Sequence, residues 1–166
     1  MALGTHGHSA GILITGDLMH LIGIAAFERF FAAAGLDIDK NDLRRFEDFL
    51  SDKISDLVER AVTNAEANGH ESVEPQDLPI TAGLSDSIRA FGRVDETVSL
   101  DAIREQLDRR AALTLPLAEA TWAQLPEVAG GIGVALARSF RILDESLKKP
   151  QPTHWDKATR IFGLLL

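Results

Sequence analysis

Residues 43–65 read LRRFEDFLSDKISDLVERAVTNA, and this stretch decides the fold of the chain. Its apolar residues recur at steps of three and four, which is the spacing of one face of an α-helix. The stripe consists of Leu43, Phe46, Leu50, Ile54, Leu57, Ala61 and Ala65. Asp39 is placed to cap this segment and Asn68-Gly69 to end it. The sequence therefore predicts a long amphipathic helix over Leu43–Ala67.

A second stripe of the same kind lies in the other half of the chain. Its members are Trp122, Leu125, Val128, Ile132, Leu136, Phe140 and Leu143. It predicts a helix over Leu117–Leu147, which Pro126 should kink or split because proline donates no backbone hydrogen bond. We expect the small residues of Gly130-Gly131-Ile132-Gly133 in this helix to allow a close approach at the crossing of the two long helices.

Shorter amphipathic segments flank both long helices. The sequence predicts short helices at residues 25–34, around 84–91, at 101–110 and at 155–166. Their expected inward residues include Phe27, Phe30, Phe31, Ile103, Leu107, Ile161, Leu164 and Leu165. No alternating apolar run is long enough to predict a sheet.

The two halves resemble each other at a constant offset of 77 residues, which aligns Ile38 with Leu115, Pro75 with Pro152, and Leu84 with Ile161. Each copy alone would leave its long stripe in water, at a cost of about 25 cal/mol per Å². We therefore predict an all-α fold in which two helix–long helix–helix motifs, residues 25–98 and 99–166, cross their long helices and share one core. This arrangement is the handshake of the histone fold, made here within one chain. Residues 1–24 are expected to be an N-terminal extension.

Composition limits the possible functions. The chain has 166 residues, a net charge of −8 and no cysteine, which excludes disulfides, thiolate catalysis and cysteine-based metal sites. Residues 1–98 carry 8 basic and 17 acidic side chains, a net charge of −9 that disfavours contact with nucleic acid. The apolar stretch near the N-terminus is interrupted by Asp17 and His20, which does not fit a signal peptide or a membrane span. We expect a cytoplasmic protein, or a nucleoid protein if it binds DNA.

Four segments carry a resemblance to a known family. They are FERFFAAAGLDIDKNDLRRFEDFL (27–50), EPQDLPITAGL (74–84), LPEVAGGI (125–132) and RILDESLKKPQPTHWDKATRIFGLLL (141–166). Together they resemble a small bacterial family of unknown function whose members look like single-chain histone pseudodimers. The resemblance covers residues 25–166 and implies a fold, with no activity to carry over.

The histone-like arrangement also indicates where DNA would bind, because paired loops of the two motifs contact phosphates in such folds. One expected pair is residues 36–40 beside 148–152, and the other is 70–73 beside 109–115. The candidate DNA-binding residues in these loops are Lys40, Arg109, Arg110, Thr114, Lys148 and Lys149. The same loops contain the acidic residues Asp37, Asp39 and Glu71, which weaken the attraction to phosphate.

Other motifs are interpreted as structural. Asp37-x-Asp39-x-Asn41 matches the first ligand positions of a calcium loop, but Asp42 and Asp48 occupy the positions that require glycine and glutamate, so we interpret the segment as a helix cap. His6 and His8 in the N-terminal stretch, and the two tryptophans, Trp122 and Trp155, are not assigned to a metal or ligand site.

No catalytic motif occurs in a recognisable context, so the sequence predicts neither an enzyme nor a cofactor or metal. The leading interpretation is a non-enzymatic histone-fold module that binds an unknown protein or a second copy of itself. The alternative is a nucleoid-associated protein that binds duplex DNA weakly and without sequence preference.

Overall fold

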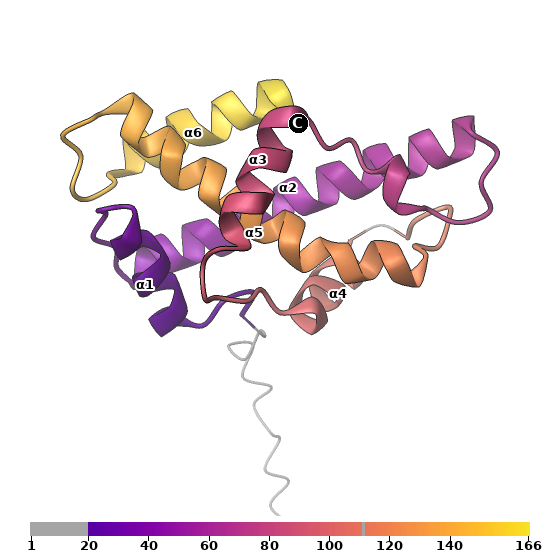
Figure 1. The fold of residues 1–166 in the computed structure, drawn as a ribbon, viewed down its shortest axis with the longest axis horizontal. Helices are drawn as coiled ribbons and strands as arrows, with labels where there is room; N and C mark the ends of the chain where they lie inside the picture. The colour runs from indigo at the N-terminus through magenta and orange to yellow at the C-terminus, as the bar shows by residue number, and fades with distance from the viewer. Residues whose placement is uncertain (1–19, 111) are drawn as a thin grey trace, which may run out of the picture.

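The computed structural model describes residues 20–110 and 112–166, and these residues form an all-helical structure (Figure 1). The helices are α1 (Ile24–Ala33), α2 (Lys40–Ala67), α3 (Ala82–Phe91), α4 (Leu100–Asp108), α5 (Glu119–Leu143) and α6 (Pro152–Leu165), with a 3₁₀ turn at Pro75–Asp77. The only strand-like pairing within the described ranges is one isolated parallel bridge between Val73 and Leu117. The predicted all-α fold class is confirmed.

Helix α2 is capped by Asp39, as the sequence predicted, and Asp42 completes a capping box that the sequence did not predict. The Asp39 carboxylate accepts hydrogen bonds from the N–H groups of Asn41 and Asp42, and Asp42 accepts one from the Asp39 N–H in return. These bonds satisfy backbone donors that a helix start would otherwise leave unpaired. Figure 1 shows α2 crossing α5 near the centre of the molecule, with the shorter helices around the crossing.

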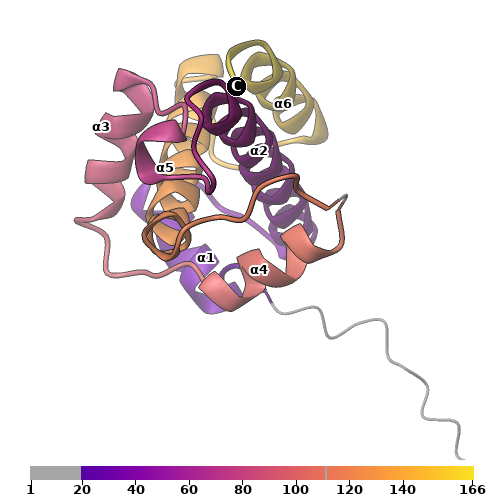
Figure 2. The same cartoon turned by 90° about the vertical axis from the view of Figure 1, so that its right-hand side faces the viewer.

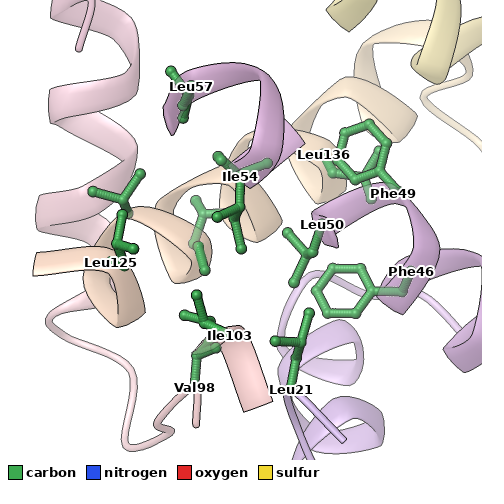
Figure 3. Packing of buried hydrophobic residues seen from close by; sticks show 14 of the residues in the cluster. Leu21, Phe46, Phe49, Leu50, Ile54, Leu57, Val98, Ile103, Leu125 and Leu136 are labelled. Carbon is green, nitrogen blue, oxygen red and sulfur yellow. The ribbon is translucent and has the colours of Figure 1, made fainter. Parts of the chain in front are cut away.

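The core lies between the two long helices. Leu50, Ile54 and Leu57 of α2 are buried together with Leu125 and Leu136 of α5 (Figure 3). Leu57 and Val134, which the offset of 77 residues aligns, are both buried, with 2% and 8% of their surface exposed.

Helix α5 differs from its prediction at two points. Pro126 lies inside the helix, which nevertheless runs unbroken from Glu119 to Leu143. Leu125 and Val128 on either side of the proline are buried, so packing holds this segment helical despite the lost hydrogen bond. The helix also ends at Leu143, four residues before the predicted end at Leu147, because the chain turns extended at Asp144 and the side chain of Leu147 folds back into the core.

The paired glycines of α5 contact α3, and the sequence did not predict this contact. A Cβ built on Gly130 would lie 2.2 Å from Phe91 Cδ1, and one built on Gly131 would lie 2.4 Å from Ile88 Cγ1. Both partners belong to α3, so for these two glycines the close approach is between α3 and α5, and the expectation that it lies at the α2–α5 crossing was wrong. Gly133 does face α2, since its added Cβ would lie 3.1 Å from Phe46 Cζ.

The short helices α3 and α6 flank the crossing pair on two sides (Figure 2). Helix α3 packs on α5, while Phe162 of α6 packs edge-on against Phe49 of α2, with 5.0 Å between ring centres. The third helix in each half of the chain therefore contacts the long helix of the other half. The division of the chain into residues 25–98 and 99–166 stays a prediction.

Helix α6 turns a different face to the core from the one we predicted. Its buried residues are Trp155, Ala158 and Phe162, spaced by three and four positions. Ile161, Leu164 and Leu165 were expected in the core, but they are exposed by 39%, 86% and 71%. This part of the prediction was wrong, because the helix carries apolar residues on two faces and only one of them packs.

The last residues of the predicted extension belong to the core. Leu21 and Ile22 are buried, and their N–H groups donate to the Glu47 carboxylate at 2.9 and 3.2 Å. The Leu21 carbonyl also accepts a hydrogen bond of 2.9 Å from the Ser99 N–H. Residues 1–19, with His6 and His8, lie outside the described part of the chain.

Candidate functional site

The first of the two predicted loop pairs lies where α2 begins and α5 ends. The Asp37 N–H donates to the Lys148 carbonyl at 2.7 Å, which fixes the two loops side by side. Lys149 Nζ donates to Asp39 Oδ2 at 2.9 Å in the same place. The structure thus brings Lys40, Lys148 and Lys149 to one end of the molecule, as the loop pairing predicted.

The charge of Lys149 is directed at the helix cap. Its hydrogen bond is the main cause that lowers the pKa of Asp39 to about 2, and the helix N–H groups add to the effect. The same hydrogen bond raises the pKa of Lys149. A phosphate that bound Lys149 would have to compete with this carboxylate, which makes the lysine a poor anion site.

The buried side of this loop pair is held by Asp42. Its Oδ1 accepts a hydrogen bond of 3.0 Å from Trp155 Nε1, and both residues are buried. Because Asp42 also closes the capping box, this carboxylate joins the start of α2 to the start of α6. The Asp37, Asp39 and Asn41 segment therefore serves as a helix cap, as interpreted from the sequence.

The second loop pair lies at the opposite ends of the long helices. The Val73 N–H donates to the Pro116 carbonyl at 2.8 Å, and the Ala118 N–H donates to the Val73 carbonyl at 3.0 Å. The buried Thr121 hydroxyl also donates to the Val73 carbonyl, at 2.6 Å. These bonds bring residue 73 beside residues 116–121, which directly follow the predicted partner segment 109–115.

Asp77 organises the loop that carries Val73. Asp77 is buried, and its Oδ2 lies 2.8 Å from Nδ1 of His70. Burial opposes ionisation of Asp77, but hydrogen bonds led by the one from His70 outweigh it and lower the pKa of this carboxyl. Because the Glu74 N–H also donates to it, Asp77 is a structural clamp for the loop.

The remaining candidates at this end are also paired within the chain. Arg109 forms an ion pair with Glu105, and Arg110 forms one with Asp52 of α2. The Thr114 hydroxyl donates to Glu66. Lys40 and Lys148 are the two predicted DNA-binding cations for which no intramolecular ion pair forms among the described residues.

The structure reveals an exposed apolar surface that the sequence prediction missed. Its centre consists of Ile142, Ile161, Leu164 and Leu165, which we call the apolar face; Ile142 is 82% exposed. Three hollows border it. The first, of about 610 Å³, lies between α1, α3 and α5; the second, of about 490 Å³, between α3, α5 and α6; and the third, of about 560 Å³, beside α6.

Cations border this apolar face. Arg138 lines the first two hollows, and Lys157 and Arg160 line the third; we call these three residues the basic rim. All three are exposed, and within residues 20–110 and 112–166 none of them forms an ion pair. The sequence did contain a signal for this exposed surface. Trp155, Ala158 and Phe162 form an apolar stripe that packs in the core, so the other apolar side of α6, which carries Leu164, stays exposed.

No group of three or more histidine or acidic side chains that could hold a metal ion occurs in the described residues. No helix in that part of the chain is long and apolar enough to cross a membrane.

A family model described as a domain of unknown function (DUF1931) matches residues 27–163. The chain belongs to this family. The match confirms the resemblance to a family of unknown function that the four sequence segments indicated. A comparison with curated proteins finds no match.

Two crystal structures resemble this DUF1931 chain. The protein ttk003001566 from Thermus thermophilus is 43% identical, with a TM-score of 0.83, and the match covers 88% of this chain and 99% of that one. The protein AQ328 from Aquifex aeolicus is 15% identical, with a TM-score of 0.68, and the match covers 90% and 99% of the two chains. At that identity the second likeness concerns the fold alone.

Proposed function

We propose that this DUF1931 chain is a non-enzymatic binding module with a single-chain histone fold, which binds another protein through its apolar face. The order of short, long and short helix occurs twice, and the two long helices cross. The loops pair at both ends of the crossing, α3 packs on the long helix of the other half, and α6 contacts both long helices. These features together support the histone handshake.

The observation that carries the function is the exposure of the apolar face. Ile142, Leu164 and Leu165 each present more than two thirds of their surface to water. Single exposed apolar side chains are ordinary, but a cluster that borders three hollows is typical of a protein interaction site. The paired loops fit this function too, because Arg109, Arg110 and Lys149 are already held by carboxylates.

Site-specific photo-crosslinking in cells that naturally express the chain tests this function. A photoactivatable amino acid would replace Ile142 in one variant and Lys40 in a matched control. We expect a discrete protein adduct from position 142 that disappears when Leu164→Ser and Leu165→Ser are added, and no such adduct from position 40. Nucleic-acid adducts from position 40, without a protein adduct from position 142, would overturn the proposal.

The alternative function is weak, non-specific DNA binding. The observation that favours it is the exposure of Lys40 and Lys148 at one end of the molecule, with no ion pair to either among the described residues. Titration of a labelled duplex should then give a dissociation constant no tighter than roughly micromolar at physiological salt. Lys148→Ala with Lys149→Ala should weaken binding to all sequences alike and lower the salt slope by up to about 2. Nanomolar or sequence-selective binding would establish DNA as the main ligand instead.

A further inference from the structure

The three hollows beside the apolar face form one continuous run. Ile142 and Arg138 line both the first and the second hollow, and Ile161 lines both the second and the third. Ala33, Ala34, Ala90 and Ala137 contribute to the first, where their short side chains leave room for a larger one. A run of successive hollows between helices fits apolar side chains that recur along an amphipathic helix, at positions i, i+3, i+4 and i+7.

The charge of this surface is the opposite of the charge of the protein. The chain carries −8 overall, yet no aspartate or glutamate of the described residues lines any of the three hollows. The basic rim and Arg141 do line them. Arg141 donates to the Leu147 carbonyl, whereas the rim residues have no ion-pair partner among the described residues. The surface therefore complements an apolar ligand with negative charge along its sides.

We infer that the apolar face binds an acidic amphipathic helix of another protein, with its apolar side chains in the three hollows and its carboxylates against Arg138, Lys157 and Arg160. This inference rests on the proposed function and names the chemistry of the partner. The hollows supply the contact area, and the basic rim supplies the selectivity for acidic over basic segments.

Two other ligands, a second copy of the chain and a lipid surface, fit the apolar face less well. A second copy in a two-fold dimer would place the same surface against itself, so the basic rim of one copy would face the basic rim of the other. A lipid surface would satisfy the cations and the exposed leucines, but it has no side chains to insert into hollows of about 490 to 610 Å³. Both occupants are outcomes of the experiment below.

The experiment measures fluorescence anisotropy with two labelled model peptides. Each has about 18 residues, or about five helical turns, with leucine at the i, i+3, i+4 and i+7 positions. One peptide carries glutamate at the remaining positions and the other carries lysine. The full chain is compared with Ile142→Ser, with the double variant Arg138→Glu and Arg160→Glu, and with a matched control, Lys40→Glu and Lys148→Glu, which has the same change in charge. Circular dichroism confirms that each variant is folded.

We expect the wild type to bind the glutamate peptide at least roughly tenfold more tightly than the lysine peptide. The Arg138 and Arg160 variant should lose this preference, whereas the Lys40 and Lys148 control should keep it. Ile142→Ser should weaken binding of the glutamate peptide, because it removes the side chain shared by two hollows.

Other results would overturn the inference in distinguishable ways. Equal binding of the two peptides, weakened alike by Ile142→Ser, would reject the acidic partner while leaving the proposed protein-binding function in place. Concentration-dependent dimerisation in sedimentation experiments that Ile142→Ser abolishes, without peptide binding, would assign the face to a second copy. Binding to phosphatidylcholine–phosphatidylglycerol vesicles, without peptide binding, would assign the face to lipid and reject both the inference and the proposed function.

Discussion

Replacing Gly131 with alanine tests how closely α3 and α5 pack. A Cβ at this position would lie 2.9 Å from the backbone N and Cα of Ile88, as well as 2.4 Å from its side chain. Non-bonded carbons pack at about 3.5–4.0 Å, so the α3 backbone has to move. Overpacking costs about 1–3 kcal/mol, and backbone movement places this site at the upper end. Alanine favours the helix by about 1 kcal/mol more than glycine does, so the expected net loss in the free energy of unfolding is about 2 kcal/mol.

That loss corresponds to a fall in melting temperature of roughly 4–8 °C for a chain of this size. The matched control is Gly163→Ala in α6, because apart from the adjoining backbone of α6 no atom of the described residues lies within 4 Å of its added Cβ. The control should gain up to about 1 kcal/mol. Urea denaturation followed by circular dichroism measures both. If Gly131→Ala is as stable as the wild type, or if the two variants shift stability in the same direction, the close packing of α3 on α5 is refuted.

Three further predictions concern the core, the helix cap and the shared fold. Leu57→Ala should lose about 2–5 kcal/mol in urea denaturation, because the leucine is buried at the core, and a loss below about 0.5 kcal/mol would contradict its placement. Lys149→Ala should raise the pKa of Asp39 from about 2 toward its ordinary value, as carboxyl NMR can measure. A lowered pKa stabilises the fold above the unfolded pKa of the group, and the effect is lost as pH falls toward 2, so the variant should be less stable than the wild type at neutral pH and the difference should shrink as the pH falls toward 2. Residues 25–98 and 99–166 expressed separately should each be poorly folded and should regain helicity when mixed, and independent cooperative folding of either half would contradict a shared core.

The sequence predicted α2 well because its determinants are local. The stripe through Leu43, Leu50 and Leu57 has helical spacing, and the capping residue Asp39 lies just before the helix. The observed helix begins at Lys40, three residues before the stripe, because the cap and not the first apolar residue sets its start.

Helix α6 could not be oriented from its sequence. Trp155, Ala158 and Phe162 form one apolar face, and Ile161 and Leu165 lie on another. Periodicity identifies both faces but does not say which one meets the core, since that depends on where α2 and α5 place the helix. The alignment at an offset of 77 also misled the prediction, because it equated the buried Leu84 with the exposed Ile161.

The pairing of the loop cations was equally hidden in the sequence. Arg110 binds Asp52, 58 positions earlier, and Lys149 binds Asp39, 110 positions earlier. The loop pairing itself followed from the predicted handshake, so both cations were placed at the correct ends of the molecule. Their neutralisation depends on side-chain geometry, which only the folded chain defines.

The packing of α3 on α5 has a consequence for the protein during its synthesis. Phe91 of α3 leaves the ribosome before its partner Gly130, and the end of α5 follows only at Leu143. At about 5–20 residues per second, translation of the roughly 50 intervening residues takes about 3–10 s. During that interval the apolar stripe of α2 has no α5 to cover it. The nascent chain therefore passes through a period in which it is open to chaperones and to aggregation, and this period ends when α5 emerges.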